Sequence, residues 1–323
     1  MTDQPKISER LREEKAFYLI SHMLPDGDSI GSLLAMGEGL LKIGKNISLF
    51  TPGHIPRKYN FLTGTETVSH EVLIVDPDIT TIVLDSSDLD RLGIFKEAVL
   101  NSKQIINIDH HVTNQRFGTL NLVDSSAAAT GELVYSLLNE LPVIITESIA
   151  ESLYVAISTD TGSFKYTNTT PNTHRVVANL LEFGLNPGTL SQKMFDEKPL
   201  SFYILLKEAL SSLELYERRR VAVMTLSKDI RERSGATTDD LEGIVNYARN
   251  IEGVELGILF YVEGNREVKV GFRSKRLDVS VLAGKLNGGG HTRAAGCRLD
   301  GDLETIKEKV IGESLKLLKE LPA

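Results

Sequence analysis

The sequence has few of the residues on which several common classes of protein depend. It contains one cysteine, Cys297, and no tryptophan among 323 residues, so a disulfide framework and a thiolate zinc site are both excluded. We expect Cys297 to be a small buried hydrophobic side chain. Aromatic residues make up 6% of the chain, which is little for a protein that stacks the bases of a long single strand.

Positive charge is also scarce, with 36 Lys and Arg against 44 Asp and Glu and a net charge of −8. Proteins that hold long nucleic acids usually have a basic surface, so a long polymer is not the expected partner. No run approaches the roughly 20 apolar residues of a membrane span. The first 17 residues are polar and of mixed charge, without the apolar core of a signal peptide. We therefore expect a cytoplasmic protein with no membrane partner.

The remaining composition, 25% charged and 41% hydrophobic, is that of a folded globular protein. In the first half, short apolar runs alternate with helical patterns. This alternation predicts an α/β domain with a mostly parallel sheet and helices on both faces. Strands are expected at 16–21, 47–50, 81–84 and 105–108, and helices at 29–43, 95–100, 131–140 and 147–158.

The length of the chain favours two domains. Helical patterns dominate residues 172–215, with a break at 196–199, and a smaller α/β region follows. We expect a catalytic, metal-binding domain at 1–195, a helical linker at 196–216 and a substrate-binding domain at 217–323. The elements expected after the break are a connecting helix at 200–215, strands at 221–226, 255–262 and 267–272, and a helix at 238–250.

Acidic residues and histidines gather where the predicted strands of the first half end. The carboxyl ends of strands in an open α/β sheet converge on the ligand crevice, so these segments have a physical reason to meet. Each segment alone has a structural interpretation, because aspartate favours turns and helix N-caps. A calcium loop is excluded, since Ile30 and Gly37 stand at positions that need oxygen ligands. The segments are His22-Met-Leu-Pro-Asp26-Gly-Asp28, Asp85-Ser-Ser-Asp88, Asp109-His110-His111 and, after a helical stretch, Asp160-Thr-Gly162.

Together these segments predict a metal site, because independent turns and caps need not all fall at strand ends. Imidazole and carboxylate without thiolate favour manganese, with iron, cobalt or zinc possible and magnesium less natural. Six or more ligands exceed what one catalytic ion needs, whereas two ions about 3.5–4 Å apart with one shared carboxylate fit the number. Asp26 and Asp28 lie on either side of a glycine, so each can face a different ion. Two such ions generate hydroxide at neutral pH and neutralise phosphoryl charge, which predicts phosphoester hydrolysis.

The four segments resemble the four motifs of the DHH phosphoesterases, in order, over most of residues 15–165. The resemblance implies that a water between two manganese ions attacks phosphorus in line. It also implies that His111 contacts the phosphate and that Asp109 and Asp88 orient other groups. The catalytic residues expected from it are Asp85, Asp109 and His111. One ion would be held by His22, Asp26 and Asp85, and the other by Asp28, Asp85, His110 and Asp160.

The C-terminal half contains a second motif, in which Gly271-Phe-Arg273-Ser274 is followed by Asn287-Gly-Gly-Gly-His-Thr-Arg-Ala-Ala-Gly296. A glycine loop that opens a short helix can cradle an anion, with arginine and histidine as further donors, and a flexible turn is the structural alternative. The motif resembles that of the DHH-associated domain, which implies that it holds the far end of the substrate. The residues expected to bind substrate are Arg273, Ser274, Gly288, Gly289, Gly290, His291 and Arg293.

Among two-domain DHH proteins, the chain is most similar to the stand-alone type that cuts very short oligoribonucleotides (nano-RNA) and dephosphorylates adenosine 3′,5′-bisphosphate (pAp). This resemblance implies a manganese-dependent homodimer that releases mononucleotides from nano-RNA or pApA and AMP from pAp. Three alternatives stay open: a phosphodiesterase for cyclic di-AMP or pApA, an inorganic pyrophosphatase, and a non-catalytic nucleotide sensor. Nothing in the sequence favours the sensor, because every expected metal position keeps a ligating residue.

Overall fold

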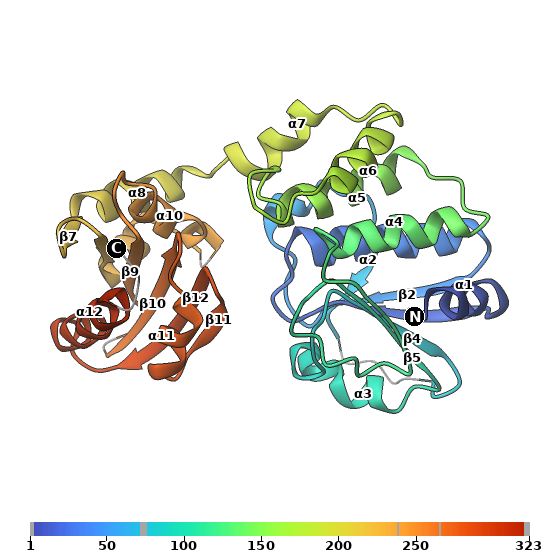
Figure 1. Ribbon diagram of the computed structural model, residues 1–323, viewed down its shortest axis with the longest axis horizontal. Helices are drawn as coiled ribbons and strands as arrows, with labels where there is room; N and C mark the ends of the chain where they lie inside the picture. The colour runs from blue at the N-terminus through green and yellow to red at the C-terminus, as the bar shows by residue number, and fades with distance from the viewer. Residues whose placement is uncertain (1–2, 72–75, 238, 265, 320–323) are drawn as a thin grey trace. The chain divides into compact units, whose positions relative to one another are not determined.

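The computed structural model describes residues 3–71, 76–237, 239–264 and 266–319, with the backbone alone at 231 and 291. The chain divides into two compact units, Met1–Glu197 and Lys198–Ala323 (Figure 1). Each unit contains its own six-stranded sheet, so the predicted α/β class is confirmed. Within the described ranges, no helix is long and apolar enough to cross a membrane.

The sheet of the first unit consists of β1 (Ala16–Ile20), β2 (Asn46–Phe50), β3 (Val68–Ser69), β4 (Thr80–Leu84), β5 (Ile105–Asp109) and β6 (Leu120–Val123). All its pairings are parallel, in the order β3-β2-β1-β4-β5-β6. The four strands predicted here agree with β1, β2, β4 and β5 to within one residue. The strand order reverses between the adjacent β1 and β4, which makes their carboxyl ends the place where such sheets bind ligands.

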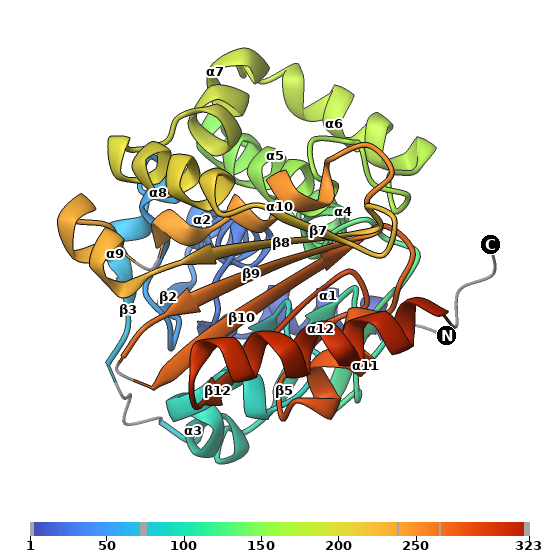
Figure 2. The same cartoon turned by 90° about the vertical axis from the view of Figure 1, so that its left-hand side faces the viewer.

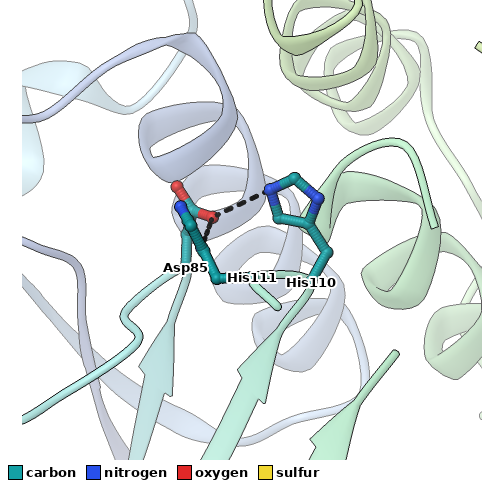
Figure 3. A group of neighbouring side chains, drawn as sticks. All are labelled: Asp85, His110 and His111. Carbon is teal, nitrogen blue, oxygen red and sulfur yellow. Dashed lines mark ion pairs between the residues drawn. The ribbon is translucent and has the colours of Figure 1, made fainter. Parts of the chain in front are cut away.

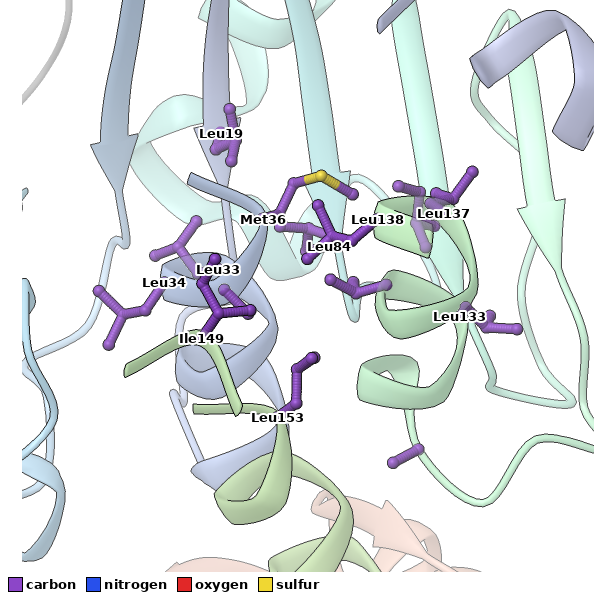
Figure 4. Close-up of a cluster of buried hydrophobic side chains, with 14 of the residues drawn as sticks. Leu19, Leu33, Leu34, Met36, Leu84, Leu133, Leu137, Leu138, Ile149 and Leu153 are labelled. Carbon is purple, nitrogen blue, oxygen red and sulfur yellow. The ribbon is translucent and has the colours of Figure 1, made fainter. Parts of the chain in front are cut away.

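Helices cover both faces of this sheet, because the strand side chains alternate between two apolar clusters. Leu19 and Leu84 belong to the larger cluster, shown in Figure 4, whereas Ile20 and Val83 belong to the smaller one. The larger cluster is covered by α2 (Gly27–Lys42), α4 (Thr130–Glu140) and α5 (Glu147–Asp160), and α1 (Gln4–Glu13) and α6 (Pro171–Leu181) pack against these helices. The smaller cluster is covered by η3 (Asp90–Phe95) and α3 (Lys96–Leu100). Shorter segments are η1 (Arg57–Tyr59), η2 (Thr65–Thr67), α7 (Pro187–Ser191) and η4 (Gln192–Asp196).

The helices α2 and α5 approach each other closely through glycines of α2. A Cβ atom added at Gly31 would lie 2.3 Å from the backbone oxygen of Ser152, and one added at Gly27 would lie 2.2 Å from Oγ1 of Thr159. Only glycine permits this separation. The glycines therefore hold the helix that begins in the first acidic segment against the helix that ends in the fourth.

The sheet of the second unit consists of β7 (Glu214–Tyr216), β8 (Val221–Leu226), β9 (Leu256–Val262), β10 (Glu267–Ser274), β11 (Gly289–His291) and β12 (Ala294–Asp300). Its order is β11-β12-β10-β9-β8-β7, and all pairs are antiparallel except β8 with β9. Helices α8 (Leu200–Ser211), α9 (Lys228–Ser234) and α10 (Ile244–Arg249) pack on one face, and α11 (Val279–Lys285) and α12 (Leu303–Lys319) on the other (Figure 2).

Three expectations for the second half differ from the structure. The helix expected at 200–215 ends at Ser211, and the chain then enters β7; α8 packs through Phe202 and Leu205 into the core of the second unit. The helix expected at 238–250 is confirmed only over α10, because Gly243 adopts φ 87° and separates η5 (Asp239–Leu241) from α10. Residue 238 lies outside the described residues. The short helix expected after the glycine loop was wrong, because Gly289 and Gly290 lie in β11 and the chain then turns into β12.

Candidate metal centre

The four acidic segments meet at the carboxyl edge of the first sheet. His22 follows β1, Asp85 follows β4, and Asp109 is the last residue of β5. Because β1, β4 and β5 are neighbours in the sheet, their ends lie side by side. The fourth segment reaches the same place through α5, whose last residue is Asp160.

Three groups of side chains have ligand atoms that all lie within 4.8 Å of one another. Asp85 belongs to two of them, and Figure 3 shows its carboxylate directed toward both His110 and His111. The group of His22, Asp26 and Asp85 equals one of the two expected ligand sets. The group of Asp28, His110 and Asp160 lacks only Asp85 from the other set. Oδ1 of Asp85 lies 3.8 Å from Nε2 of His110. The groups are His22, Asp26 and Asp85; Asp28, His110 and Asp160; and Asp85, His110 and His111.

Asp26 and Asp28 differ in environment although both lie at the start of α2. Asp26 is the N-cap, and its Oδ1 accepts a hydrogen bond from the backbone of Ser29 at 3.0 Å. Its Oδ2 lies 3.9 Å from Nε2 of His22. Asp28 is 1% exposed and accepts hydrogen bonds from the backbone of Thr130 at 2.6 Å and of Gly131 at 2.9 Å. These donors belong to the first turn of α4, so Asp28 caps a second helix while facing the site.

Asp85 has a backbone conformation that is unusual for a residue with a side chain. Its φ is 58°, in the left-handed region, and such strain is concentrated at functional sites. Its Oδ2 lies 3.3 Å from Nε2 of His22, and its Oδ1 accepts a hydrogen bond from Oγ1 of Thr130 at 2.9 Å. The strained turn therefore places one carboxylate between the His22 side and the His110 side of the site.

His110 is oriented by a backbone contact. Its Nδ1 lies 3.3 Å from the carbonyl oxygen of Ala127, and Nδ1–H can donate to that oxygen. The other nitrogen, Nε2, then faces the acids, 3.4 Å from Oδ2 of Asp160 and 3.8 Å from Oδ2 of Asp28. This arrangement, in which one ring nitrogen is fixed by an acceptor, is usual for metal-binding histidines.

His111 pairs with Asp109 instead. Its Nδ1 lies 2.7 Å from Oδ1 of Asp109, whose Oδ2 accepts a hydrogen bond from Asn114 at 2.6 Å. Burial lowers the pKa of His111, but the bond with Asp109 and the charge of Asp85 outweigh that effect and raise it. Burial likewise raises the pKa of Asp109, but its bonds with His111 and Asn114 reverse the direction and lower it. The pair therefore favours a protonated imidazole beside an ionised carboxylate.

The residues present fit a divalent metal. Nε2 of His22 is buried and has no hydrogen-bond partner among the described residues. Burial lowers the pKa of His22 to about 4, so its imidazole is neutral at pH 7, as a metal ligand must be. Burial and neighbouring carboxylates raise the pKa values of Asp28 and Asp85 well above the ordinary value for aspartate. A bound cation would be a partner for Nε2 of His22 and would reduce the repulsion between the buried carboxylates of Asp28 and Asp85.

Asp88 lies outside these three groups. Its Oδ1 accepts from the backbone of Arg91 at 3.1 Å and its Oδ2 from Oγ of Ser87 at 3.0 Å. In addition, the hydroxyl of Ser86 donates to its carbonyl oxygen. Asp88 therefore stabilises the turn that follows Asp85, and its carboxylate is occupied with that turn.

The residues that hold these side chains in place were not predicted from the sequence. Thr130 and Gly131 bind acids more than 40 residues away along the chain, and Asn114 binds Asp109. A threonine and a glycine at a predicted helix start are a weak signal for an anion-binding N-terminus. Asn114 lies in a loop and gives no signal in the sequence.

The expected substrate-binding residues of the second unit lie around one end of its sheet. Arg273 in β10 is paired with Ala294 in β12, which is paired with His291 in β11; the side chain of His291 lies outside the described residues. The Arg273 guanidinium donates to the carbonyl oxygen of Phe272 at 2.9 Å. Arg293 donates to the carbonyl oxygens of Arg276 and Leu277.

Ser274 and the glycines shape this end of the sheet. Ser274 is 3% exposed, and its hydroxyl donates to the carbonyl oxygen of Leu277 at 2.5 Å. A Cβ atom at Gly288 would lie 2.2 Å from the carbonyl oxygen of Gly296, whereas Gly289 has open space there. Gly290 adopts φ 142°. The glycines thus permit a tight hairpin of β11 and β12, and Cys297 in β12 is buried as expected.

Comparison with known proteins agrees with this geometry. Residues 16–157 match the N-terminal domain of the DHH family, and residues 219–320 match the DHHA1 domain. The chain is 35% identical over 303 residues to the bifunctional oligoribonuclease and PAP phosphatase NrnA of Thermus thermophilus, covering 92% of this chain and 89% of that protein. It is 28% identical over 297 residues to the Bacillus subtilis protein of the same name, covering 88% and 92%. Among solved structures, it is similar to an exopolyphosphatase-related protein from Bacteroides fragilis, with a TM-score of 0.91, 25% identity and coverage of 98% and 97%.

Proposed function

Because this chain belongs to the DHH family, with an N-terminal DHH domain and a C-terminal DHHA1 domain, we propose that it hydrolyses short oligoribonucleotides to mononucleotides and pAp to AMP. The enzyme is a phosphoesterase of that family. The names of the Thermus and Bacillus relatives include both activities. The observation that supports the chemistry most strongly is the position of Asp85, whose two carboxylate oxygens face His22 and His110.

We assign six residues to two divalent ions, with manganese as the metal. His22, Asp26 and Asp85 would hold one ion, and Asp28, Asp85, His110 and Asp160 the other. When bound, such ions act as Lewis acids that neutralise phosphoryl charge and activate water. The donor set supports manganese, because it combines imidazole with carboxylate and contains no thiolate.

The protein's own groups position the phosphate and hold a proton beside it. Asp109 fixes the His111 ring through Nδ1 at 2.7 Å, so we assign Nε2 of His111 to a phosphate oxygen. Against the effect of burial, the bond with Asp109 raises the pKa of His111 above its ordinary value, which favours the protonated ring, in which Nε2–H is a donor. Asp109 is thus a positioning residue, and His111 contacts the reacting group.

We assign the far end of the substrate to the hairpin end of the second sheet. Gly288, Gly289 and Gly290 let an anion approach the loop, since none of them has a side chain. The backbone N–H of Gly288 donates to the carbonyl oxygen of Ala283 at 2.8 Å, so we assign the N–H groups of Gly289 and Gly290 to the anion. Arg273 and His291 add donors to that anion. Ser274 and Arg293 serve the same site by holding the neighbouring loop, to which both donate hydrogen bonds.

We extend the proposal to the length of the substrate and to the oligomeric state and location of the protein. The net charge of −8 supports short substrates over long nucleic acid. We also propose a homodimer, which the resemblance to two-domain DHH proteins implies, and a cytoplasmic location. A cyclic dinucleotide presents the same phosphoester to the metal centre, and hydrolysis of cyclic di-AMP is therefore the alternative activity to test.

The decisive experiment is a substrate panel assayed with manganese and, in parallel, with magnesium. The panel contains pAp, pApA, oligoribonucleotides of two to five residues, cyclic di-AMP and pyrophosphate. We expect turnover of pAp and the shortest oligonucleotides, with AMP among the products. Hydrolysis of cyclic di-AMP alone, or of pyrophosphate alone, would replace the proposed substrate with that compound.

Asp85→Asn supplies the matched control, because it keeps the shape of the side chain and removes its charge. We expect this variant to lose metal binding in calorimetry and to lose hydrolysis of every member of the panel. A variant that binds two ions and turns over pAp normally would show that Asp85 is not the shared ligand.

A further inference from the structure

The chain makes a strained turn directly after Asp160. Gly162, Ser163 and Phe164 follow one another with φ of 56°, 59° and 63°. Ser163 and Phe164 have side chains, which disfavour this left-handed conformation. Hydrogen bonds hold the turn, since the backbone of Ser163 donates to the Ser158 carbonyl oxygen at 2.7 Å. Strain of this kind persists only where the surrounding structure imposes it, and it is concentrated at functional sites.

The turn directs two aromatic side chains to different environments. Phe164 packs against Tyr154 and His174, with ring centroids 6.2 and 5.5 Å away. Tyr166 is 55% exposed, and its ring lies over Gly162, where an added Cβ atom would be 2.3 Å from Cζ. Phe164 therefore anchors the turn in the core, whereas Tyr166 presents a held ring to solvent.

This exposed ring lies beside the candidate metal centre. Gly162, on which it rests, is two residues from Asp160, and Asp160 lies 3.4 Å from His110. The side chain of Asn168 joins this segment to the residues before α4, because it donates to the carbonyl oxygens of Asp160 at 3.1 Å and Ala128 at 3.0 Å. Ala128 leads into α4, whose first turn binds Asp28. The backbone of Tyr166 donates to the carbonyl oxygen of Thr161 at 3.0 Å, so the segment that carries the ring and the segments that carry the acids belong to one hydrogen-bonded assembly.

We propose that Tyr166 is a stacking platform for the nucleobase of the nucleotide whose phosphate lies at the metal centre. This inference rests on the proposed function, because it requires a nucleotide substrate. In a nucleotide, one ribose separates the base from its phosphate, and the ring rests on Gly162, two residues after Asp160. Every base has a π-face, so stacking recognises a nucleotide without selecting its sequence. An aromatic ring that is half exposed and fixed in place suits this contact, since little side-chain freedom is lost on binding.

Tryptophan substitution gives a direct binding assay, because the chain has no tryptophan of its own. In Tyr166→Trp, AMP should quench the indole fluorescence at constant manganese concentration, whereas ribose 5-phosphate should not. The matched control is Ile144→Trp, since Ile144 is 82% exposed and precedes the opposite end of α5, about 20 Å away. AMP should leave this control unchanged. Equal responses to AMP in the two variants, or equal responses of Tyr166→Trp to AMP and ribose 5-phosphate, would overturn the proposal.

Kinetics separate stacking from a structural role. We expect Tyr166→Ala to lower kcat/KM for pAp about 5- to 150-fold, which corresponds to the free energy of stacking one base on an aromatic ring. The same variant should leave kcat/KM for ribose 3,5-bisphosphate unchanged. Tyr166→Phe should behave like the wild type with both compounds. Equal losses on both compounds would mean that the ring only supports the turn at Gly162, which refutes the proposal. If the wild type hydrolysed neither compound, the proposed function would fail, and the fluorescence assay would still decide whether a base stacks on residue 166.

Discussion

Replacing Gly31 with alanine should separate the two helices that supply acids to the second proposed metal ion. Gly31 lies in α2, three residues after Asp28, and the partner helix α5 ends in Asp160. An alanine Cβ would stand 2.3 Å from the backbone oxygen of Ser152 in α5. Because that distance is far shorter than an ordinary contact between carbon and oxygen, the backbone of α5 must move.

The size of the effect follows from two opposing contributions. Alanine favours a helix over glycine by about 1 kcal/mol. Against this, overpacking a well-packed core costs about 1–3 kcal/mol. The upper part of that range applies, because the clash is with a backbone atom and no side-chain rotation relieves it. We expect a net loss of roughly 1–2 kcal/mol, which lowers the melting temperature of the first unit by about 2–8 °C.

Calorimetric melting of Gly31→Ala, with and without manganese, measures this loss. The matched control is Gly312→Ala, since Gly312 lies inside α12 and an added Cβ atom there meets nothing within 4 Å. The control should gain up to about 1 kcal/mol from helix propensity alone. Gly31→Ala should also bind manganese more weakly. Stabilisation of Gly31→Ala similar to that of the control would refute the close contact of α2 with α5.

Three further predictions concern charge and binding. As pH rises above the ordinary pKa of aspartate, Asp28 and Asp85 should make the metal-free protein lose stability. Their raised pKa values mean that the folded state keeps protons that the unfolded chain has released. Melting curves in chelator should show this contribution, and manganese should reduce it. Glu255→Ala should lower the melting temperature of the second unit through a loss of about 1–3 kcal/mol, because the buried carboxylate accepts hydrogen bonds from two backbone N–H groups of the adjacent loop; an unchanged melting curve would count against this role. Arg273→Ala should raise KM for pAp with little change in kcat, and steady-state kinetics with an unchanged KM would contradict the assignment of Arg273 to substrate binding.

The four strands β1, β2, β4 and β5 and the acidic segments were predictable because their signals are local, whereas β3 and β6 were not predicted. Each buried strand is a short apolar run, and each acidic segment follows directly where such a run, or a helix, ends. The parallel arrangement then follows from the alternation of strands and helices. From the local signals and the parallel arrangement together, the acids could be predicted to lie at one edge of the sheet.

The supporting contacts were not predictable, because they join distant parts of the chain. Thr130 and Asp28 are 102 residues apart, and nothing near either residue in the sequence identifies the other. The hairpin of β11 and β12 was missed for a different reason, since glycine has no side chain and produces no alternating pattern. The left-handed φ of Asp85 also gives no sequence signal, because aspartate is common in ordinary turns.

The most direct test of the central claim is a manganese titration of the metal-stripped protein, with bound metal and pAp hydrolysis measured on the same samples. Two ions held by six side chains predict that activity reaches its maximum only when two manganese ions are bound per chain. Full activity with one bound ion, or hydrolysis by the metal-free protein, would contradict the shared role of Asp85 and the two-metal centre built around it.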